Sequence, residues 1–279
     1  MGFDRSGGEV IRQPLESQLE SKVEYTYIPS SLHIFESVPS TNQTLWRLLK
    51  DGADKNSVVI ATHQTSGRGQ WGREWISPPG GLYLSVGVVP KLEAADSYRL
   101  TLASAWGIAA QLRQCGISVG IKWPNDLVLQ GRKLGGILTE TKVNNGQITQ
   151  AVIGVGINWA NPVPETGINL QSWQASQPHQ AISGLEMLTK TVLVGIQSGI
   201  DCLSQEGISV LLSQYLDLLT NIGEQVYIDN LLGTVVGVTT QGNLHISFEI
   251  KEPNDIKMPE IYLEPGTISL GYRKSSVLF

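Results

Sequence analysis

Cysteine and long apolar runs are what this sequence most clearly lacks. Its 279 residues include two cysteines, Cys115 and Cys202, which stand far apart and outside any CxxC pattern. This spacing indicates neither a disulfide framework nor a zinc site, and it favours a reducing, cytoplasmic location. No run of about 18 consecutive apolar residues is present, and charges interrupt the N-terminal stretch. We therefore expect a soluble protein that is neither exported nor bound to a membrane.

Positive charge is also in short supply. Lys and Arg together number 20 against 25 Asp and Glu, which gives a formal net charge of −5. An acidic chain is poorly suited to a broad nucleic-acid interface, so we expect no DNA partner. Hydrophobic residues make up 41% of the chain, enough for a sizeable core in one large or two smaller domains.

Residues 1–30 are polar and contain one short helical pattern, formed by Leu15, Leu19 and Val23. This is too little apolar surface for an independent core, so the pattern predicts a flexible N-terminal arm. It also leaves no room for a three-helix DNA-binding domain ahead of the first core element.

Residues 31–222 mix strand and helix patterns and are interpreted as the main domain. Ser40 with Gln43, and Ser183 with Glu186, have the capping-box spacing that opens a helix, and further helices are expected after Ser97 and at 211–219. A polar loop is expected at 161–179, and strand patterns occur at 32–35, 57–62, 82–89, 119–123, 127–129, 134–143 and 147–159. Because hairpin signals join several of these strands, the predicted fold class is α+β, with a mixed, largely antiparallel sheet and helices packed on it.

Residues 223–279 change to short strand patterns separated by turns, at 226–228, 234–238, 244–248, 260–263 and 267–270. So many strands in so short a span predict a small β-barrel, which forms the second domain.

The most informative stretch is the glycine-rich string GRGQWGREWISPPGG, which follows a β-branched run. It places Arg68 and Arg73 among glycines, an arrangement that can wrap backbone amides and guanidinium groups around a phosphate or carboxylate. The string also reads G-x-G-x-x-G. A dinucleotide site would need a helix after the third glycine, however, and Pro78-Pro79-Gly80-Gly81 cannot continue one. A mobile loop between two strands is the better interpretation, and an ordinary solvated loop is the plain alternative.

Two further strings carry candidate site residues. In KWPNDLVLQGRKLGGILTE, Pro124 interrupts a strand, so Asn125 and Asp126 are expected at a kink, while Lys133 lies next to a hairpin turn. In IGVGINW, Gly154 and Gly156 leave a strand without side chains, which indicates either a ligand against the backbone or a β-bulge. Each string alone has an ordinary structural explanation.

Taken together, these strings resemble the biotin–protein ligases. The set consists of Ser40-Thr41-Asn42, Gln64, GRGQWGR with WISPPGG, KWPNDLVLQGRKLGGIL and IGVGIN, and the tail from Gly266 to Leu270 is similar to the end of the family's C-terminal barrel. The match extends over roughly residues 32–271, and several independent strings agree in order. The resemblance implies a class II synthetase-like catalytic domain and an SH3-like barrel. Without a DNA-binding domain ahead of it, it also implies a monofunctional ligase.

The resemblance further implies a two-step reaction. ATP and biotin, with Mg²⁺, would form biotinyl-5′-adenylate and pyrophosphate. A lysine of a biotin carboxyl carrier domain, from acetyl-CoA carboxylase or another biotin-dependent carboxylase, would then attack the adenylate and release AMP. Cations in the motifs fit this chemistry, because joining two anions requires their repulsion to be offset. Family members pair through their sheets, which leaves a homodimer open.

Roles follow by position. Lys133 and Arg68 are the predicted catalytic residues: Lys133 would contact the biotin carboxylate and the α-phosphate, and Arg68 would belong to the loop that closes over them. The predicted biotin-binding residues are Ser40, Thr41, Asn42, Gln64, Arg68, Gly69, Gln70, Lys133, Gly135, Gly136 and Gly156. The predicted nucleotide-binding residues are Arg73, Lys122, Trp123, Asn125, Asp126 and Asn158, with Asp126 also a candidate metal ligand.

Two positions depart from the family pattern. Gln70 stands where many relatives have arginine, which predicts weaker retention of the adenylate, and Gly271 stands where some have arginine after the terminal Ser-Leu. Three alternatives stay open: a lipoate or octanoate ligase on the same fold, a non-catalytic biotin sensor, and a repressor.

Overall fold

The computed structural model describes residues 29–248, 260–268 and 270–272. Within these, seven strands form one sheet in the order β1-β2-β3-β7-β6-β5-β4. Their bounds are β1 (Ser31–Val38), β2 (Ser57–Gln64), β3 (Leu82–Val88), β4 (Gly120–Lys122), β5 (Asp126–Leu129), β6 (Arg132–Asn144) and β7 (Gln147–Ile157). The β1–β2 pair is parallel and the other neighbours are antiparallel, which confirms a mixed, largely antiparallel sheet.

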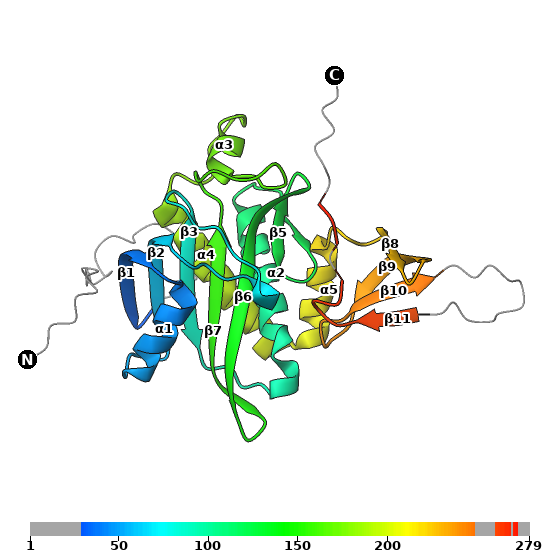
Figure 1. Cartoon of the computed structure of the whole chain (residues 1–279), viewed down its shortest axis with the longest axis horizontal. Coiled ribbons are helices and arrows are strands. Elements are labelled where there is room, and N and C mark those ends of the chain that lie inside the picture. The colour runs from blue at the N-terminus through cyan, green and yellow to red at the C-terminus, as the bar shows by residue number, and fades with distance from the viewer. Residues whose placement is uncertain (1–28, 249–259, 269, 273–279) are drawn as a thin grey trace, which may run out of the picture.

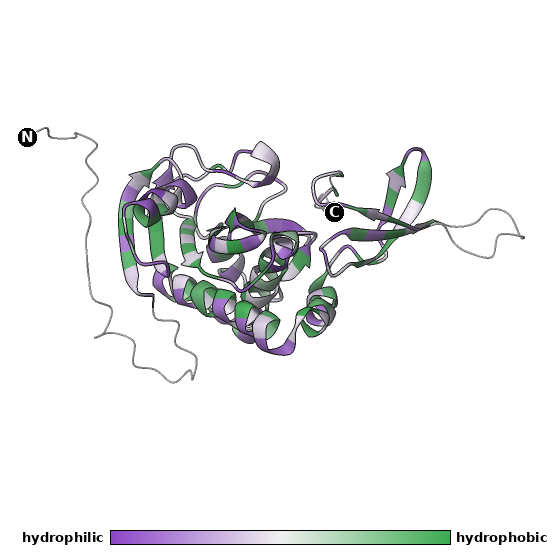
Figure 2. Ribbon diagram, turned by 90° about the horizontal axis from the view of Figure 1, so that it is seen from below, coloured by the Kyte–Doolittle hydropathy of each residue, from purple (hydrophilic) through white to green (hydrophobic). Residues whose placement is uncertain are grey.

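Helices cover both faces of this sheet (Figure 1). On one face, α1 (Thr41–Lys50) packs on β2, β3 and β7. On the other, α2 (Tyr98–Gln114) packs on β4, β5 and β6, while α4 (Leu185–Asp201) and α5 (Ile208–Leu218) pack on α2 and on the sheet. Figure 2, turned by 90°, shows the long helices along one side of the strands and α1 on the other.

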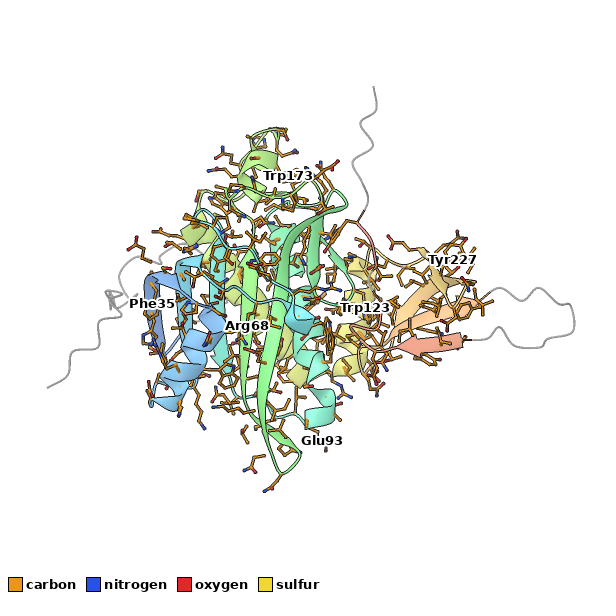
Figure 3. All side chains as sticks on the ribbon, in the orientation of Figure 1. Phe35, Arg68, Glu93, Trp123, Trp173 and Tyr227 are labelled. Carbon is orange, nitrogen blue, oxygen red and sulfur yellow. The ribbon has the colours of Figure 1, made fainter. Side chains whose placement is uncertain are left out.

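The strands bury apolar side chains on both faces because each face has its own helical cover. Leu84 and Ile153 belong to the large core beneath α2 and α4, whereas Val59 and Phe35 pack with Leu45 of α1 (Figure 3). Successive side chains of a strand point to opposite faces, so neighbouring residues of β2 serve different cores. The face that carries α1 also carries the candidate site.

Helices α2 and α4 pack so closely that their backbones are in contact. A Cβ atom built on Gly107 would lie 1.9 Å from the carbonyl oxygen of Gly195, and one on Gly199 would lie 2.0 Å from that of Ala103. Side chains larger than hydrogen cannot occupy these glycine positions without moving a helix.

Two predicted capping boxes do not form. The Ser40 side chain makes no cap hydrogen bond; instead the Gln64 amide oxygen accepts from the first helical N–H, that of Thr41, at 2.8 Å. Helix α4 begins at Leu185 after Gly184, and its N-cap likewise has no side-chain hydrogen bond. The first N–H of α1 therefore donates to a side chain of β2, far along the sequence. A local sequence pattern cannot reveal such a partner.

The connections between the strands and helices match those predicted from the sequence, with one exception. Asn145-Gly146 forms the β6–β7 turn with both residues at positive φ, as that dipeptide predicts. β4 ends before Pro124, whose peptide bond with Trp123 is cis, and β5 begins at Asp126, so the predicted kink is confirmed. The predicted loop at 161–179 was wrong in part, because it contains the short helix α3 (Leu170–Gln174), capped by the Asn169 side chain.

The described C-terminal residues form a separate four-stranded antiparallel sheet. It consists of β8 (Gln225–Ile228), β9 (Leu231–Val238), β10 (Leu244–Phe248) and β11 (Glu260–Leu263). The fifth predicted strand is absent at 267, 268 and 270, where the chain is irregular, so the described residues make an open sheet and no closed barrel. Of the predicted N-terminal arm, residues 1–28 lie outside the described part. None of the described helices is long and apolar enough to cross a membrane.

Candidate functional site

The sheet register gathers the candidate residues on one face. Asp126 pairs with Gly136, Gly136 with Gly156, and Gly156 with Tyr83. Two residues along, Leu138 pairs with Gly154, and Gly154 with Ser85. Paired residues point to the same side of a sheet, so two rows of side chains across β5, β6, β7 and β3 form the base of a pocket.

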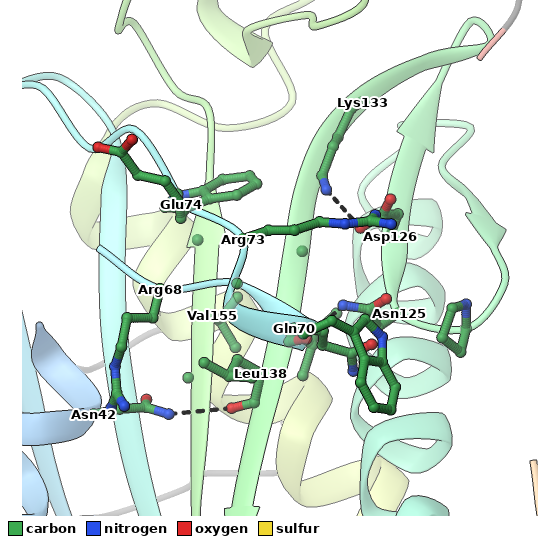
Figure 4. Close-up of a pocket in the computed structure, with 18 of the residues that line it drawn as sticks. Asn42, Arg68, Gln70, Arg73, Glu74, Asn125, Asp126, Lys133, Leu138 and Val155 are labelled. Carbon is green, nitrogen blue, oxygen red and sulfur yellow. Dashed lines mark hydrogen bonds and ion pairs between the residues drawn. The ribbon is translucent and has the colours of Figure 1, made fainter. Parts of the chain in front are cut away.

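The pocket is lined by 26 residues from α1, β2, the glycine-rich loop, the β4–β5 turn, β6, β7 and the C-terminal segment (Figure 4). The β7 glycines are needed there. A Cβ on Gly154 would lie 2.2 Å from Asn42 Oδ1, and one on Gly156 would lie 2.4 Å from Trp75 Nε1. The register runs without a shift through these positions, so the close approach of side chains, and no bulge, explains both glycines.

One end of the pocket, called the polar end, is lined by Ser40, Thr41, Asn42 and Gln64, with Ser85 hydrogen-bonded behind them, and all five residues are buried. The Ser85 hydroxyl lies 2.8 Å from Thr41 Oγ1 and 2.6 Å from Asn42 Oδ1. Gln64 accepts from Thr41 and donates to Ser77 Oγ at 2.8 Å. These bonds fix the orientation of both side-chain amides, so the polar end presents a defined set of donors and acceptors.

The opposite end, called the charged end, contains Arg73, Lys122, Asn125, Asp126 and Lys133. Lys133 Nζ lies 2.7 Å from Asp126 Oδ1, and Arg73 extends across the pocket toward Asp126 (Figure 4). Asn125 donates to the carbonyl of Ile137 at 2.6 Å, which fixes the turn that carries the aspartate. With three cations around one aspartate, this end carries excess positive charge and suits an anion such as a phosphate.

Burial affects the ionisation of Lys122. The residue is 7% exposed, and the loss of solvation lowers the pKa of its ammonium group below the usual value, while nearby Asp126 acts in the opposite direction. Burial also raises the pKa of Tyr98, which hydrogen-bonds to Gln70 at 3.2 Å. Gln70 therefore has a neutral partner at the place where the family pattern has a cation.

The glycine-rich loop folds over the pocket as a small flap of residues 65–76. Gly69 donates to the Arg73 carbonyl at 2.7 Å and Trp75 donates to the Gly67 carbonyl at 3.0 Å, with a 3₁₀ turn (Gln70–Gly72) at the tip. β2 and β3 flank this loop, as predicted, and no α-helix follows Gly72 until α2. The dinucleotide interpretation is thereby excluded.

Two side chains of the flap reach the base of the pocket. Arg68 forms an ion pair with Glu140 of β6 at 3.2 Å. Trp75 lies over Gly156, with its ring centre 5.1 Å from Lys133 Nζ, and its indole N–H has no hydrogen-bond partner among the described residues. The flap thus contacts both ends of the site.

Arg68 and Lys133 line the same pocket, with the β6 and β7 backbone between them (Figure 4). Most of the other predicted site residues line it too, namely Ser40, Thr41, Asn42, Gln64, Gly69, Gln70, Arg73, Lys122, Trp123, Asn125, Asp126, Gly136 and Gly156. Gly135 and Asn158 lie outside the lining. Asn158 donates to the backbone carbonyl of Lys133 at 3.3 Å, so it supports the strand that carries the lysine.

Sequence reasoning missed several residues of the site. Ser77 and Ser85 join the polar end through hydrogen bonds, and Glu140 contacts Asn42, Trp46 and Arg68. Alternation along β6 gives a signal for Glu140, which lies four residues beyond Gly136 on the same face. Ser77 and Ser85 have no such signal, because single serines are common in strands and loops.

The comparisons with known proteins agree with this geometry. Residues 34–158 match the biotin/lipoate A/B protein ligase family. The bifunctional ligase/repressor BirA of Salmonella typhimurium is 31% identical over 245 residues, which cover 85% of this chain and 76% of that protein. The biotin–[acetyl-CoA-carboxylase] ligase of Mycobacterium tuberculosis is 37% identical over 136 residues, or 46% of this chain and 48% of that one.

Solved structures share the fold. The biotin protein ligase of Aquifex aeolicus in complex with biotin and ATP superposes with a TM-score of 0.64 at 23% identity, covering 83% of this chain and 95% of that one. The chain belongs to the biotin/lipoate A/B protein ligase family.

Proposed function

We propose that this chain is an ATP-dependent biotin–protein ligase, which forms biotinyl-5′-AMP and transfers the biotinyl group to a lysine of a biotin carboxyl carrier domain. The observation that carries the proposal is one pocket with two unlike ends. A buried polar end suits an uncharged ligand head, and a cationic end suits phosphates.

The polar end favours biotin over lipoate or octanoate. Biotin carries a cyclic urea with two N–H donors and a carbonyl acceptor, which match hydroxyl and amide groups such as those of Ser40, Asn42 and Gln64. The dithiolane of lipoate and the tail of octanoate have no such groups. Either acid would therefore make fewer hydrogen bonds at the polar end than biotin makes.

In the first step, a biotin carboxylate oxygen attacks the α-phosphorus of ATP and pyrophosphate leaves. We assign Lys133 to the carboxylate and the α-phosphate, and Arg68 to the flap that covers them. Both cations already hold carboxylates, Asp126 at 2.7 Å and Glu140 at 3.2 Å, so they are preorganised for an anionic ligand. In the second step the acceptor lysine nitrogen attacks the acyl carbon, and AMP leaves.

Magnesium is the implied metal. Among the described residues no three His, Cys, Asp or Glu side chains come together as a metal site. A single carboxylate such as Asp126 fits Mg²⁺, which is usually held by one or two carboxylates together with substrate phosphates. When bound, the ion would neutralise phosphate charge.

Other features of the family complete the proposal. We assign residues 31–222 to the catalytic domain and residues 223–279 to an SH3-like barrel, of which the four-stranded sheet is the described part. The acceptor is the carrier domain of acetyl-CoA carboxylase or another biotin-dependent carboxylase, in the cytoplasm. The net charge of −5 supports an enzyme that does not bind DNA.

The test is acceptor labelling. The chain is incubated with ATP, Mg²⁺, biotin and a carboxylase carrier domain, and the carrier mass is followed. A gain of one biotinyl group, lost when the acceptor lysine is changed to arginine, supports the ligase. Lipoate replaces biotin in a parallel reaction, and labelling by lipoate alone would overturn the assignment. Biotin binding without labelling would identify a non-catalytic sensor.

A further inference from the structure

Tyr272, in the C-terminal segment that follows β11, lies against the charged end of the pocket. Its hydroxyl donates a hydrogen bond to Asp126 Oδ2, while the other oxygen of the same carboxylate holds Lys133 Nζ at 2.7 Å. The aspartate therefore bridges the tyrosine and the lysine.

The ring of Tyr272 has a second partner. Lys122 Nζ lies 3.7 Å from the ring centre, within cation–π distance. Because burial disfavours the charge of Lys122, an aromatic face is a means of keeping that ammonium charged inside the pocket wall. One side chain thus contacts both Lys122 and the carboxylate that holds Lys133.

The path of the chain shows how the tyrosine reaches this place. Gly266, Ile268 and Leu270 line the pocket, and a Cβ atom on Gly266 would lie 2.5 Å from the Trp71 ring at the flap tip. The C-terminal segment therefore closes the pocket beside the flap. Gly271 stands where some relatives have arginine and provides no side chain. The next residue, Tyr272, supplies an aromatic contact instead.

We propose that Tyr272 is a positioning residue for ATP: through Asp126 and Lys122 it holds two ammonium groups at the spacing that receives the nucleotide phosphates. The proposal rests on the ligase function assigned above. Tyr272 itself is not part of the pocket lining, so it acts through these neighbours. The hydrogen bonds of the polar end involve none of these residues.

The experiment uses the full chain and pyrophosphate exchange that depends on biotin and ATP. For Tyr272→Leu we expect the KM for ATP to rise by about 10-fold, since a buried cation–π contact and a hydrogen bond to a carboxylate are lost. The dissociation constant for biotin alone, from calorimetry, should rise by less than the KM for ATP, because Lys133 is the one of the two ammonium groups that is also assigned to biotin. Tyr272→Phe keeps the ring contact with Lys122 but loses the hydrogen bond to Asp126, so its KM for ATP should lie between those of the wild type and Tyr272→Leu.

Tyr227→Leu is the matched control, because this tyrosine is exposed on the C-terminal sheet and away from the pocket (Figure 3). Thermal unfolding midpoints are measured for all variants. An unchanged KM for ATP in Tyr272→Leu would overturn the proposal, and so would equal losses of ATP and biotin affinity with a lower midpoint, which indicate a structural role. Absence of exchange in the wild type would instead overturn the ligase function, and the Tyr272 proposal with it.

Discussion

Arg68 of the flap is held by Glu140 of β6, with guanidinium nitrogen and carboxylate oxygen 3.2 Å apart. The same carboxylate accepts from the Asn42 amide at 2.9 Å and from the Trp46 indole at 3.2 Å. One carboxylate thus joins the flap, the first helix and the sheet. A ligand carboxylate would compete with Glu140 for the same arginine.

Replacing Glu140 by glutamine tests this exchange. Because the ion pair is partly exposed, we expect a loss of unfolding free energy below about 1 kcal/mol. The ligand-free flap should be released, so trypsin should cleave faster at Arg68 or Arg73. Biotin with ATP should protect the flap in both forms. Equal cleavage of ligand-free wild type and variant would count against a holding role.

Removing either predicted catalytic cation should suppress adenylate formation. Lys133→Ala and Arg68→Ala each remove a charge-assisted contact, and we expect rates about 10²-fold lower, with the fold intact because both side chains are partly exposed. Pyrophosphate exchange measures the rate. Lys142→Ala is the control, since this lysine lies on the same strand but outside the pocket lining. Wild-type rates in both alanine variants would refute the assignment.

The β7 glycine beneath Asn42 should be intolerant of substitution. In Gly154→Ala the new methyl group would lie 2.2 Å from Asn42 Oδ1, so Asn42 must leave its hydrogen bond with Ser85. We expect biotin affinity to fall by about 10-fold or more, together with a loss of about 1–3 kcal/mol in stability. Gly184→Ala, where a Cβ meets open space, is the matched control. Calorimetry with biotin alone, carried out on both variants, compares their biotin affinities.

Buried tyrosines predict a sharp alkaline limit to stability. Burial raises the pKa of Tyr83 to about 12 and that of Tyr215 well above its ordinary value. An unfolded tyrosine titrates near pH 10, so the folded state binds these protons more tightly. Their contribution is therefore complete below about pH 10 and is lost as the pH rises toward 12. Tyrosinate absorbance should rise together with the loss of far-ultraviolet dichroism, and ionisation well before unfolding would contradict this.

Sequence reasoning worked where the determining information was local. The Asn145-Gly146 turn and the kink at Pro124 are each set by neighbouring residues, and both agree with the sequence. The pocket lining also followed, because several motifs in a fixed order specify one arrangement. The glycines of β7 were recognised because a strand without side chains needs an explanation.

Contacts between residues far apart in the sequence could not be predicted from local patterns. The Thr41 amide receives its partner from Gln64, 23 positions later, so Ser40 was given a capping role that it does not have. The expected fifth strand of the C-terminal domain does not form at Ile268. This residue lines the pocket and does not pair with a neighbouring strand. The contact of Tyr272 with Asp126 spans 146 positions and has no local signal.

The glycine contact between α2 and α4 bears on how substitution data for this chain should be interpreted. Gly107 and Gly195 will tolerate change as poorly as Gly154 and Gly156, although they pack helix against helix behind the sheet. A survey that ranked positions by tolerance alone would put all four in the same group. Protein yield and ligand affinity, measured together, would separate them: the helix glycines set how much folded protein accumulates, and the strand glycines set what that protein binds.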